Sequence, residues 1–154
     1  MTKRRPDTDL DDLVEMAKGL AHPGRLRLLA MLAGGELCVC QMTAVLALAP
    51  STVSQHLSVL SRGGLVVERK EGKLVFYRLR EDGAGAALLA PLLGMLAADS
   101  TVKSDRNVVA RLRRVPVATL CAADLDLEAV GVRVRSTQTP HNRRSGNALK
   151  RRPA

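Results

Sequence analysis

The sequence predicts a mainly α-helical domain with one small β-hairpin, and three observations carry this prediction. Apolar residues recur at helical spacing over most of residues 9–98. Two runs rich in Val, Leu, Phe and Tyr, residues 65–70 and 73–79, are separated by only two residues, the second of which is Gly72. Two glycine pairs divide the helical part into short segments. We therefore expect four short helices, then a tight hairpin, then a further helix.

The first two predicted helices supply much of the core. Residues 9–20 repeat apolar side chains on one face, and Asp9 is positioned to cap the start. Pro23 opens a second helix that extends to about Ala33. Leucines cover most of the circumference of this second helix, which predicts a central position in the core. These leucines are Leu26, Leu28, Leu29 and Leu32.

The third and fourth predicted helices, residues 36–47 and 50–62, are joined by a brief break. This is the helix-turn-helix arrangement, whose second helix enters the major groove of DNA. Apolar residues follow one face of the fourth helix, while hydroxyls, an amide and a cation follow the other. A merely solvated face is the alternative interpretation. The residues that we predict to meet bases or nearby phosphates are Ser51, Thr52, Ser54, Gln55 and His56.

The hairpin carries a basic cluster at its tip, next to the fourth helix. Residues 50–80 hold six basic side chains and two acidic ones. We predict that Arg69, Lys70 and Lys73 contact the phosphate backbone. A helix-turn-helix followed directly by such a hairpin predicts a winged helix-turn-helix that binds double-stranded DNA.

Composition and charge divide the chain into four regions. The net charge of +9 comes mostly from the ends, and the basic segments are an N-terminal arm, residues 1–8, and a tail, residues 136–154, which we expect to be disordered. The DNA-binding and dimerisation domain is expected over residues 9–100 and a helical extension, with a linker at 101–104, over residues 101–135. No run of eighteen apolar residues and no signal peptide is present, so we expect a cytoplasmic protein that does not bind a membrane.

Residues 84–98 form a fifth predicted helix with a broad apolar band. A small domain that already has a core offers little to cover this band. A symmetric homodimer interface, shared with the first helix, is the natural solution. Pro91 is expected to kink this helix or to mark its true start.

Two of the three cysteines, Cys38 and Cys40, lie one residue apart at the start of the third predicted helix. Cys38 continues the apolar stripe of that helix and is compatible with an ordinary core position, whereas Cys40 is not on the stripe. Helix N-termini lower the pKa of thiols, which favours binding of a soft ion. On a regular helix, residues i and i+2 point about 200° apart. We therefore predict that one ion bound by both sulfurs distorts the first turn and so alters the fourth helix.

These segments together resemble the metal-responsive winged-helix repressors of the ArsR/SmtB family. The resemblance covers about residues 20–79 and rests on the stretches LAHPGRLRLLAML, GGELCVCQM, APSTVSQHLSVLSRGGLV and ERKEGKLVFYRL. It implies a homodimer that binds a palindromic operator when metal-free and releases it on capturing a toxic metal or metalloid. The ELCVC stretch resembles the site of the arsenic and antimony sensors and half of the site of the cadmium and lead sensors.

The chain departs from the patterns of these sensors. The best-known arsenic sensors have a further cysteine where this chain has Thr43, and cadmium and lead sensors use cysteines of an N-terminal arm, whereas residues 1–37 contain none. Zinc sensors often use Asp and His on the fifth helix, but residues 84–98 contain no histidine. The remaining thiol, Cys121, is either a buried apolar residue or the third ligand, from the same protomer or from its partner. Three thiolates suit a pyramidal trivalent arsenic or antimony, whereas zinc and cadmium normally take a fourth ligand.

The sequence thus predicts a repressor, not an enzyme, that binds operator DNA as a homodimer. Release is expected when As(III) or Sb(III) binds Cys38, Cys40 and Cys121, with no organic cofactor. A sensor of Cd, Pb or Zn and a thiol redox-sensing repressor of the same fold are the alternatives. Enzyme chemistry is disfavoured, because no phosphate-cradling glycine loop, nucleophile elbow or paired carboxylates are present.

Overall fold

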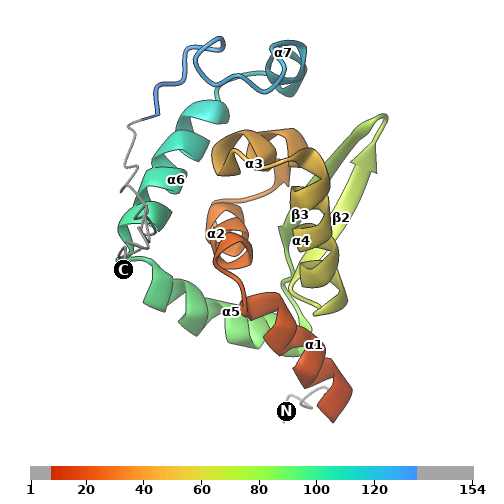
Figure 1. Ribbon diagram of the computed structural model, residues 1–154. Helices are drawn as coiled ribbons and strands as arrows, with labels where there is room; N and C mark the ends of the chain where they lie inside the picture. The colour runs from red at the N-terminus through yellow and green to blue at the C-terminus, as the bar shows by residue number, and fades with distance from the viewer. Residues whose placement is uncertain (1–7, 135–154) are drawn as a thin grey trace, which may run out of the picture.

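The structure is a computed structural model that describes residues 8–134 (Figure 1). The predictions for residues 1–7 and for the basic tail therefore lie outside the described residues. In chain order the elements are α1 (Leu10–Leu20), α2 (Pro23–Leu32), β1 (Leu37–Cys38), α3 (Val39–Leu46), α4 (Pro50–Arg62), β2 (Val66–Glu71), β3 (Leu74–Leu79), α5 (Gly83–Leu96), α6 (Ser100–Leu112) and α7 (Val117–Ala122). No single helix in this part of the chain has the length and apolarity to cross a membrane, and only α5 and α6 taken together, bent by 105°, pass that test.

The helix starts follow local capping chemistry. The Asp9 carboxylate accepts a hydrogen bond of 2.8 Å from the backbone N–H of Asp12, which caps α1. His22 Nδ1 accepts one of 3.0 Å from the N–H of Gly24, and Pro23 occupies the first position of α2, where its missing N–H has no helical partner to lose. Both predicted starts are confirmed.

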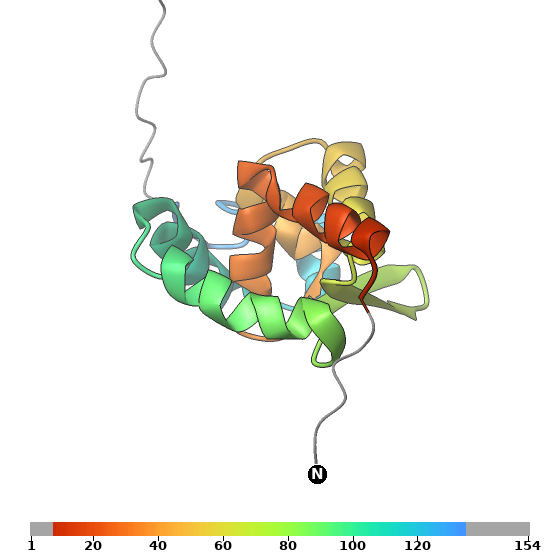
Figure 2. The ribbon, with the colours of Figure 1, turned by 90° about the horizontal axis from the view of Figure 1, so that it is seen from below.

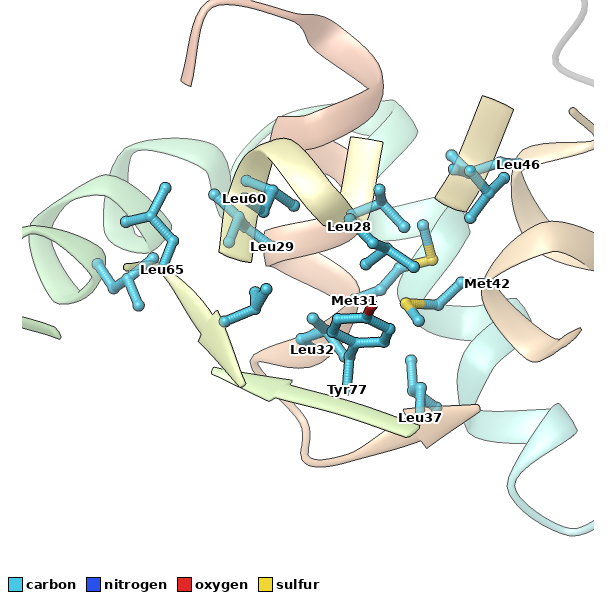
Figure 3. Packing of buried hydrophobic residues seen from close by; sticks show 14 of the residues in the cluster. Leu28, Leu29, Met31, Leu32, Leu37, Met42, Leu46, Leu60, Leu65 and Tyr77 are labelled. Carbon is cyan, nitrogen blue, oxygen red and sulfur yellow. The ribbon is translucent and has the colours of Figure 1, made fainter. Parts of the chain in front are cut away.

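The core is built around α2, as predicted (Figures 1 and 3). Four of its side chains are at most 2% exposed, namely Leu28, Leu29, Met31 and Leu32. They meet Leu37 and Tyr77 from the sheet and Met42 from α3 (Figure 3). Truncating one such leucine to alanine costs about 2–5 kcal/mol of stability, because the cavity collapses only partly.

The hairpin is one part of a three-stranded antiparallel sheet in the order β1-β3-β2. The short strand β1 adds Leu37 opposite Tyr77 and Cys38 opposite Phe76. The sequence analysis begins the third helix at residue 36, which is wrong, because α3 begins at Val39. The side chain of buried Gln41 explains the boundary, since its Oε1 accepts the Cys38 N–H at 2.9 Å and so closes the first turn of α3.

Helix α6 corrects the domain boundary near residue 100. Residues 101–104, expected as a linker, lie in its first turns, and the Asp99 carboxylate caps it by accepting from the N–H groups of Thr101 and Val102. The helix packs against α2 and α3. Arg27 on α2 forms a two-bonded ion pair with buried Asp105, at 2.7 and 2.8 Å. The DNA-binding domain therefore extends through α6.

Residues 113–134 fold back over one end of α3 and α6, at the top of Figure 1. This segment and the two helices share a second apolar cluster, whose buried members are Ala44, Val108, Leu112, Leu120 and Val132. Leu120 of α7 is 1% exposed. The cluster holds α7 against α3, the helix that follows Cys38.

Candidate thiol site and nucleic-acid interface

Cys40 and Cys121 lie in contact within one chain. Their sulfurs are 2.9 Å apart, with Cys121 contributed by α7 and Cys40 by the first turn of α3. Both thiols are free and half-buried. Of the two arrangements left open by the sequence, the structure has the contact within the protomer, and it arises because the second apolar cluster packs α7 on α3.

Cys38 is the neighbour of this pair but belongs to a different element. It is 1% exposed, ends β1 and precedes α3 with extended backbone (φ −73°, ψ 147°). The argument that two sulfurs on one regular helix point about 200° apart therefore does not apply. Any group that joins Cys38 to Cys40 bridges the junction of strand β1 and helix α3 rather than the interior of a helix.

The Cys40 thiol is held in its protonated form. Burial raises its pKa to about 12, and the hydrogen bond with Cys121 and the nearby Cys38 thiol act in the same direction. The expectation of a lowered pKa at this helix N-terminus is thus wrong for Cys40, because desolvation and two neighbouring sulfurs outweigh the helix dipole.

Two converging thiols, rather than three, form the ready-made part of the site. Among residues 8–134, no three His, Cys, Asp or Glu side chains are arranged to hold a metal ion. Thr43 occupies the position of the further cysteine of the best-known arsenic sensors, and it is 4% exposed with no hydrogen-bond partner for its Oγ1. The third thiol available to the Cys40–Cys121 pair is Cys38, which lies near enough to influence the pKa of Cys40.

The exposed face of α4 carries three of the five predicted DNA contacts, Ser51, Ser54 and Gln55, while Thr52 is half-buried. His56 requires a correction, because it is only 9% exposed and packs against His22 with ring centroids 4.4 Å apart. Its Nδ1 lies 3.4 Å from an Arg25 nitrogen, and burial, followed by His22 and Arg25, lowers its pKa. In this structure His56 joins α4 to α2.

The basic tip of the hairpin is partly neutralised. Lys70 and Lys73 are exposed, as predicted, although Lys70 lies 3.9 Å from a Glu68 oxygen. Arg69 is paired with Glu36 at 2.6 Å and with Glu71 at 2.7 Å. These contacts raise the pKa of Arg69 and lower that of Glu36. The Arg69 guanidinium is therefore committed to two carboxylates within the chain.

Sequence reasoning missed Glu36 and Phe76, which connect the thiol region to the hairpin. In the sheet, Phe76 pairs with Cys38 on one side and with Arg69 on the other. Residues in register on antiparallel strands share a face, so the three form one row across the sheet. The Arg69 guanidinium lies over the Phe76 ring, 4.7 Å from its centroid. The hairpin register alone predicts the Arg69–Phe76 neighbours, but β1 was hidden inside the predicted helix.

Arg113, also missed, anchors the loop that leads into β1. Its two terminal nitrogens donate to the carbonyl oxygens of Glu36 and Gly35, both at 3.0 Å. The end of α6, the start of β1 and the hairpin are thus joined through successive polar contacts of Glu36.

Comparison with known proteins gives the same fold. Residues 22–67 match the family described as bacterial regulatory protein, arsR family. The chain is 45% identical over 83 residues to the biofilm growth-associated repressor of Agrobacterium fabrum, covering 54% of this chain and 70% of that protein. It is 40% identical over 67 residues to the arsenical resistance operon repressor of Escherichia coli, covering 43% of this chain and 57% of that protein.

A solved structure agrees over the same region. HlyU from Vibrio cholerae superposes with a TM-score of 0.52 at 35% identity, over 60% of this chain and 99% of that one. The elements shared with these proteins include the helix-turn-helix α3–α4 and the start of the β2–β3 hairpin, both within or next to the matched residues. The chain belongs to the ArsR family of winged helix-turn-helix transcriptional repressors.

Proposed function

We propose that this chain is a homodimeric repressor that releases operator DNA when trivalent arsenic or antimony binds Cys38, Cys40 and Cys121. The observation that carries the proposal is the 2.9 Å contact between Cys40 and Cys121, with Cys38 beside them at the end of β1. Two sequence-distant thiols meet in a family that includes an arsenical resistance repressor.

The thiol chemistry favours arsenous acid over a divalent cation. Arsenous acid condenses with three thiols to give an arsenic trithiolate and three waters, so each thiol proton leaves in a water molecule with an arsenic hydroxyl. No free thiolate has to persist beforehand, which suits a Cys40 whose pKa is raised to about 12. A divalent cation instead displaces the thiol protons into solvent and normally takes a fourth ligand.

The path from the thiols to DNA runs through the sheet. Cys40 and Cys121 are already in contact, so capture of the third bond of arsenic draws on Cys38 and therefore on β1. A shift of β1 acts on Phe76, its neighbour in the row, and on Glu36, which holds Arg69. This replaces the distorted-helix hypothesis with movement of a strand next to the wing, the β2–β3 hairpin.

The DNA-facing surface of the proposal consists of α4 and the wing. Ser51, Ser54 and Gln55 present hydroxyls and an amide to the groove, and Lys70 and Lys73 present charge to the phosphates. Each chain would read one half of a palindromic operator.

The proposed dimer interface consists of α1 and α5, which lie at the end of the molecule opposite α7 (Figures 1 and 2). Figure 2 views that end, where Leu10 is 75% exposed, Leu13 50% and Met95 80%. Helix α5 begins at Gly83 and runs through Pro91. A second copy would remove these side chains from water.

Arsenic X-ray absorption of the loaded protein tests the proposed ligand set. We expect three sulfur neighbours for arsenic in the wild type and two in Cys38→Ala, with an oxygen in the vacant position. Three sulfur neighbours in Cys121→Ser at one arsenic per chain would contradict the assignment of Cys121.

A disulfide switch is the second candidate, because the same 2.9 Å contact places two free thiols side by side. A peroxide would oxidise them to a disulfide while being reduced to two waters. Release of DNA by peroxide in the absence of arsenite, lost in both Cys40→Ser and Cys121→Ser, would support this function. Release by arsenite under reducing conditions would support the metalloid function.

A further inference from the structure

We infer that Cys40 and Cys121 by themselves form a binding site for trivalent mono-organoarsenicals, in which one of the three arsenic bonds is to carbon. The inference rests on the proposed function at the same thiols and narrows the class of ligand. It separates a two-thiol ligand, which needs only this pair, from inorganic arsenite, which also needs Cys38.

The number of converging sulfurs carries the first step. The pair is in contact at 2.9 Å, whereas Cys38 lies on another element and is 1% exposed. With bonds of roughly 2.3 Å from a soft centre to sulfur, two sulfurs on one centre stand about 3–4 Å apart. The pair therefore accepts a shared arsenic after a small separation, without any change at β1.

The surroundings of the pair carry the second step. Cys40 packs against the second apolar cluster, and α7 places Leu120 of that cluster next to Cys121. The cluster also includes half-buried Val45, Val115 and Leu125. An apolar methyl or phenyl substituent on arsenic fits this environment, since each apolar group removed from water stabilises the complex.

The access to the sulfurs carries the third step. Both Cys40 and Cys121 are half-buried, so solvent reaches the pair, while Cys38 is closed off. A ligand can thus arrive at the pair with its substituent on the open side.

The reaction balances without an oxidant. An arsenical with one carbon substituent and two hydroxyls condenses with two thiols. Two As–O bonds and two S–H bonds break, two As–S bonds form, and two waters leave. Arsenic stays trivalent, and the As–C bond is untouched.

The test measures binding of phenylarsenous acid and of arsenite to the full chain under reducing conditions, by intact mass and by equilibrium competition. The proteins are the wild type, Cys38→Ala, Cys40→Ser and Cys121→Ser. Alanine is chosen at position 38 because a serine hydroxyl there would be buried. Circular dichroism and a thermal midpoint establish that each variant is folded.

We expect one phenylarsenical per chain, with loss of two waters, and an affinity in Cys38→Ala within about threefold of the wild type. Cys40→Ser and Cys121→Ser should each lose about 100-fold or more, because one thiol removes the chelate advantage. Arsenite affinity should fall strongly in all three variants.

The two proposals fail in different ways. If Cys38→Ala loses phenylarsenous acid as strongly as it loses arsenite, the two-thiol site is wrong while the arsenite site stands. If the wild type binds phenylarsenous acid through Cys40 and Cys121 but does not bind arsenite, the proposed function is wrong while the two-thiol site stands.

Discussion

Cys40 illustrates how burial decides the chemistry of a single thiol. Its pKa is raised to about 12 by desolvation first and by Cys121 next, so it stays protonated at neutral pH. The helix N-terminus at which it lies acts in the opposite direction and is outweighed. A ligand that carries its own hydroxyl groups is therefore better matched to this thiol than a bare cation.

This pKa predicts how the response to each ion depends on pH. A divalent cation releases thiol protons, so the cadmium concentration needed for DNA release should rise as pH falls from 8 to 6, by about tenfold per pH unit for each proton displaced. Arsenous acid releases water instead, so its midpoint should change less than about threefold over the same range. Fluorescence anisotropy of a labelled operator measures both. An arsenite response as steep in pH as that of cadmium would contradict the condensation chemistry.

His56 predicts a pH dependence of stability. Burial, His22 and Arg25 lower its pKa, so the unfolded chain binds the proton more readily than the folded chain. Its stabilising contribution is therefore present above the ordinary histidine pKa and is lost as pH falls through that value toward the lowered one. The free energy of unfolding should decrease from pH 7.5 to pH 5.5, and His56→Gln should weaken this decrease. An equal decrease in the variant would exclude His56 as the source.

At the scale of elements, the sheet joins the thiol region to the wing. Strand β1 contains Cys38 and follows Glu36, and Glu36 holds Arg69 by a bidentate contact. Glu71 holds the same guanidinium from the tip of the hairpin. These two carboxylates differ in one respect, since only Glu36 is attached to the strand that carries a thiol.

Glu36→Gln tests this connection, with Glu71→Gln as its matched control. Each variant removes one negative charge beside Arg69, so each should bind DNA somewhat more tightly in the absence of arsenite, by up to about fivefold. The arsenite-induced loss of DNA affinity should shrink in Glu36→Gln and stay intact in Glu71→Gln. Equal arsenite responses in the two variants would exclude the path through Glu36.

The α2–α6 junction predicts a large loss of stability. Asp105 is 5% exposed and receives two hydrogen bonds from Arg27, so Asp105→Ala leaves the guanidinium partly buried without its carboxylate. We expect a loss of about 2–4 kcal/mol in the free energy of unfolding, measured by urea denaturation. The exposed pair of Arg80 and Asp82 supplies the control, since Asp82→Ala should change stability little. A loss at Asp105 as small as that at Asp82 would contradict the role of α6 in the core.

At the scale of the whole molecule, the unpaired apolar faces of α1 and α5 predict the assembly. Leu13→Glu and Met95→Glu, at 50% and 80% exposed positions, should convert the dimer to monomers and weaken operator binding by at least tenfold. Val134→Glu, at a position 45% exposed outside α1 and α5, is the control and should leave both properties unchanged. Sedimentation equilibrium measures the assembly. A dimer that survives both substitutions would place the interface elsewhere.

Much of this architecture was predictable from sequence because its signals are local. The caps of α1 and α2, the apolar periodicity of α2 and α4, and the turn at Gly72 depend on neighbouring residues, and the structure has each of them. Strand β1 was not predictable in the same way. Its two residues become a strand only because β3, nearly 40 residues later, supplies the hydrogen-bonding partner.

The candidate site divides along the same line. The spacing of Cys38 and Cys40 marked them as chemically interesting, but the contact of Cys40 with Cys121 depends on apolar packing across 81 residues of sequence. The burial of His56 and the pairing of Arg69 likewise depend on α2 and on Glu36. Residue type and spacing identify candidate ligands, whereas tertiary packing decides which of them meet and which are already occupied.

The most direct test of the central claim is arsenite-induced release of operator DNA, measured for the wild type and for the single-site variants Cys38→Ala, Cys40→Ser and Cys121→Ser. All four proteins should bind the operator with similar affinity in the absence of arsenite. Arsenite should then release the wild type at low concentration, while each variant should require at least about tenfold more. Release of all three variants at the wild-type arsenite concentration would contradict the thiol site on which this account depends.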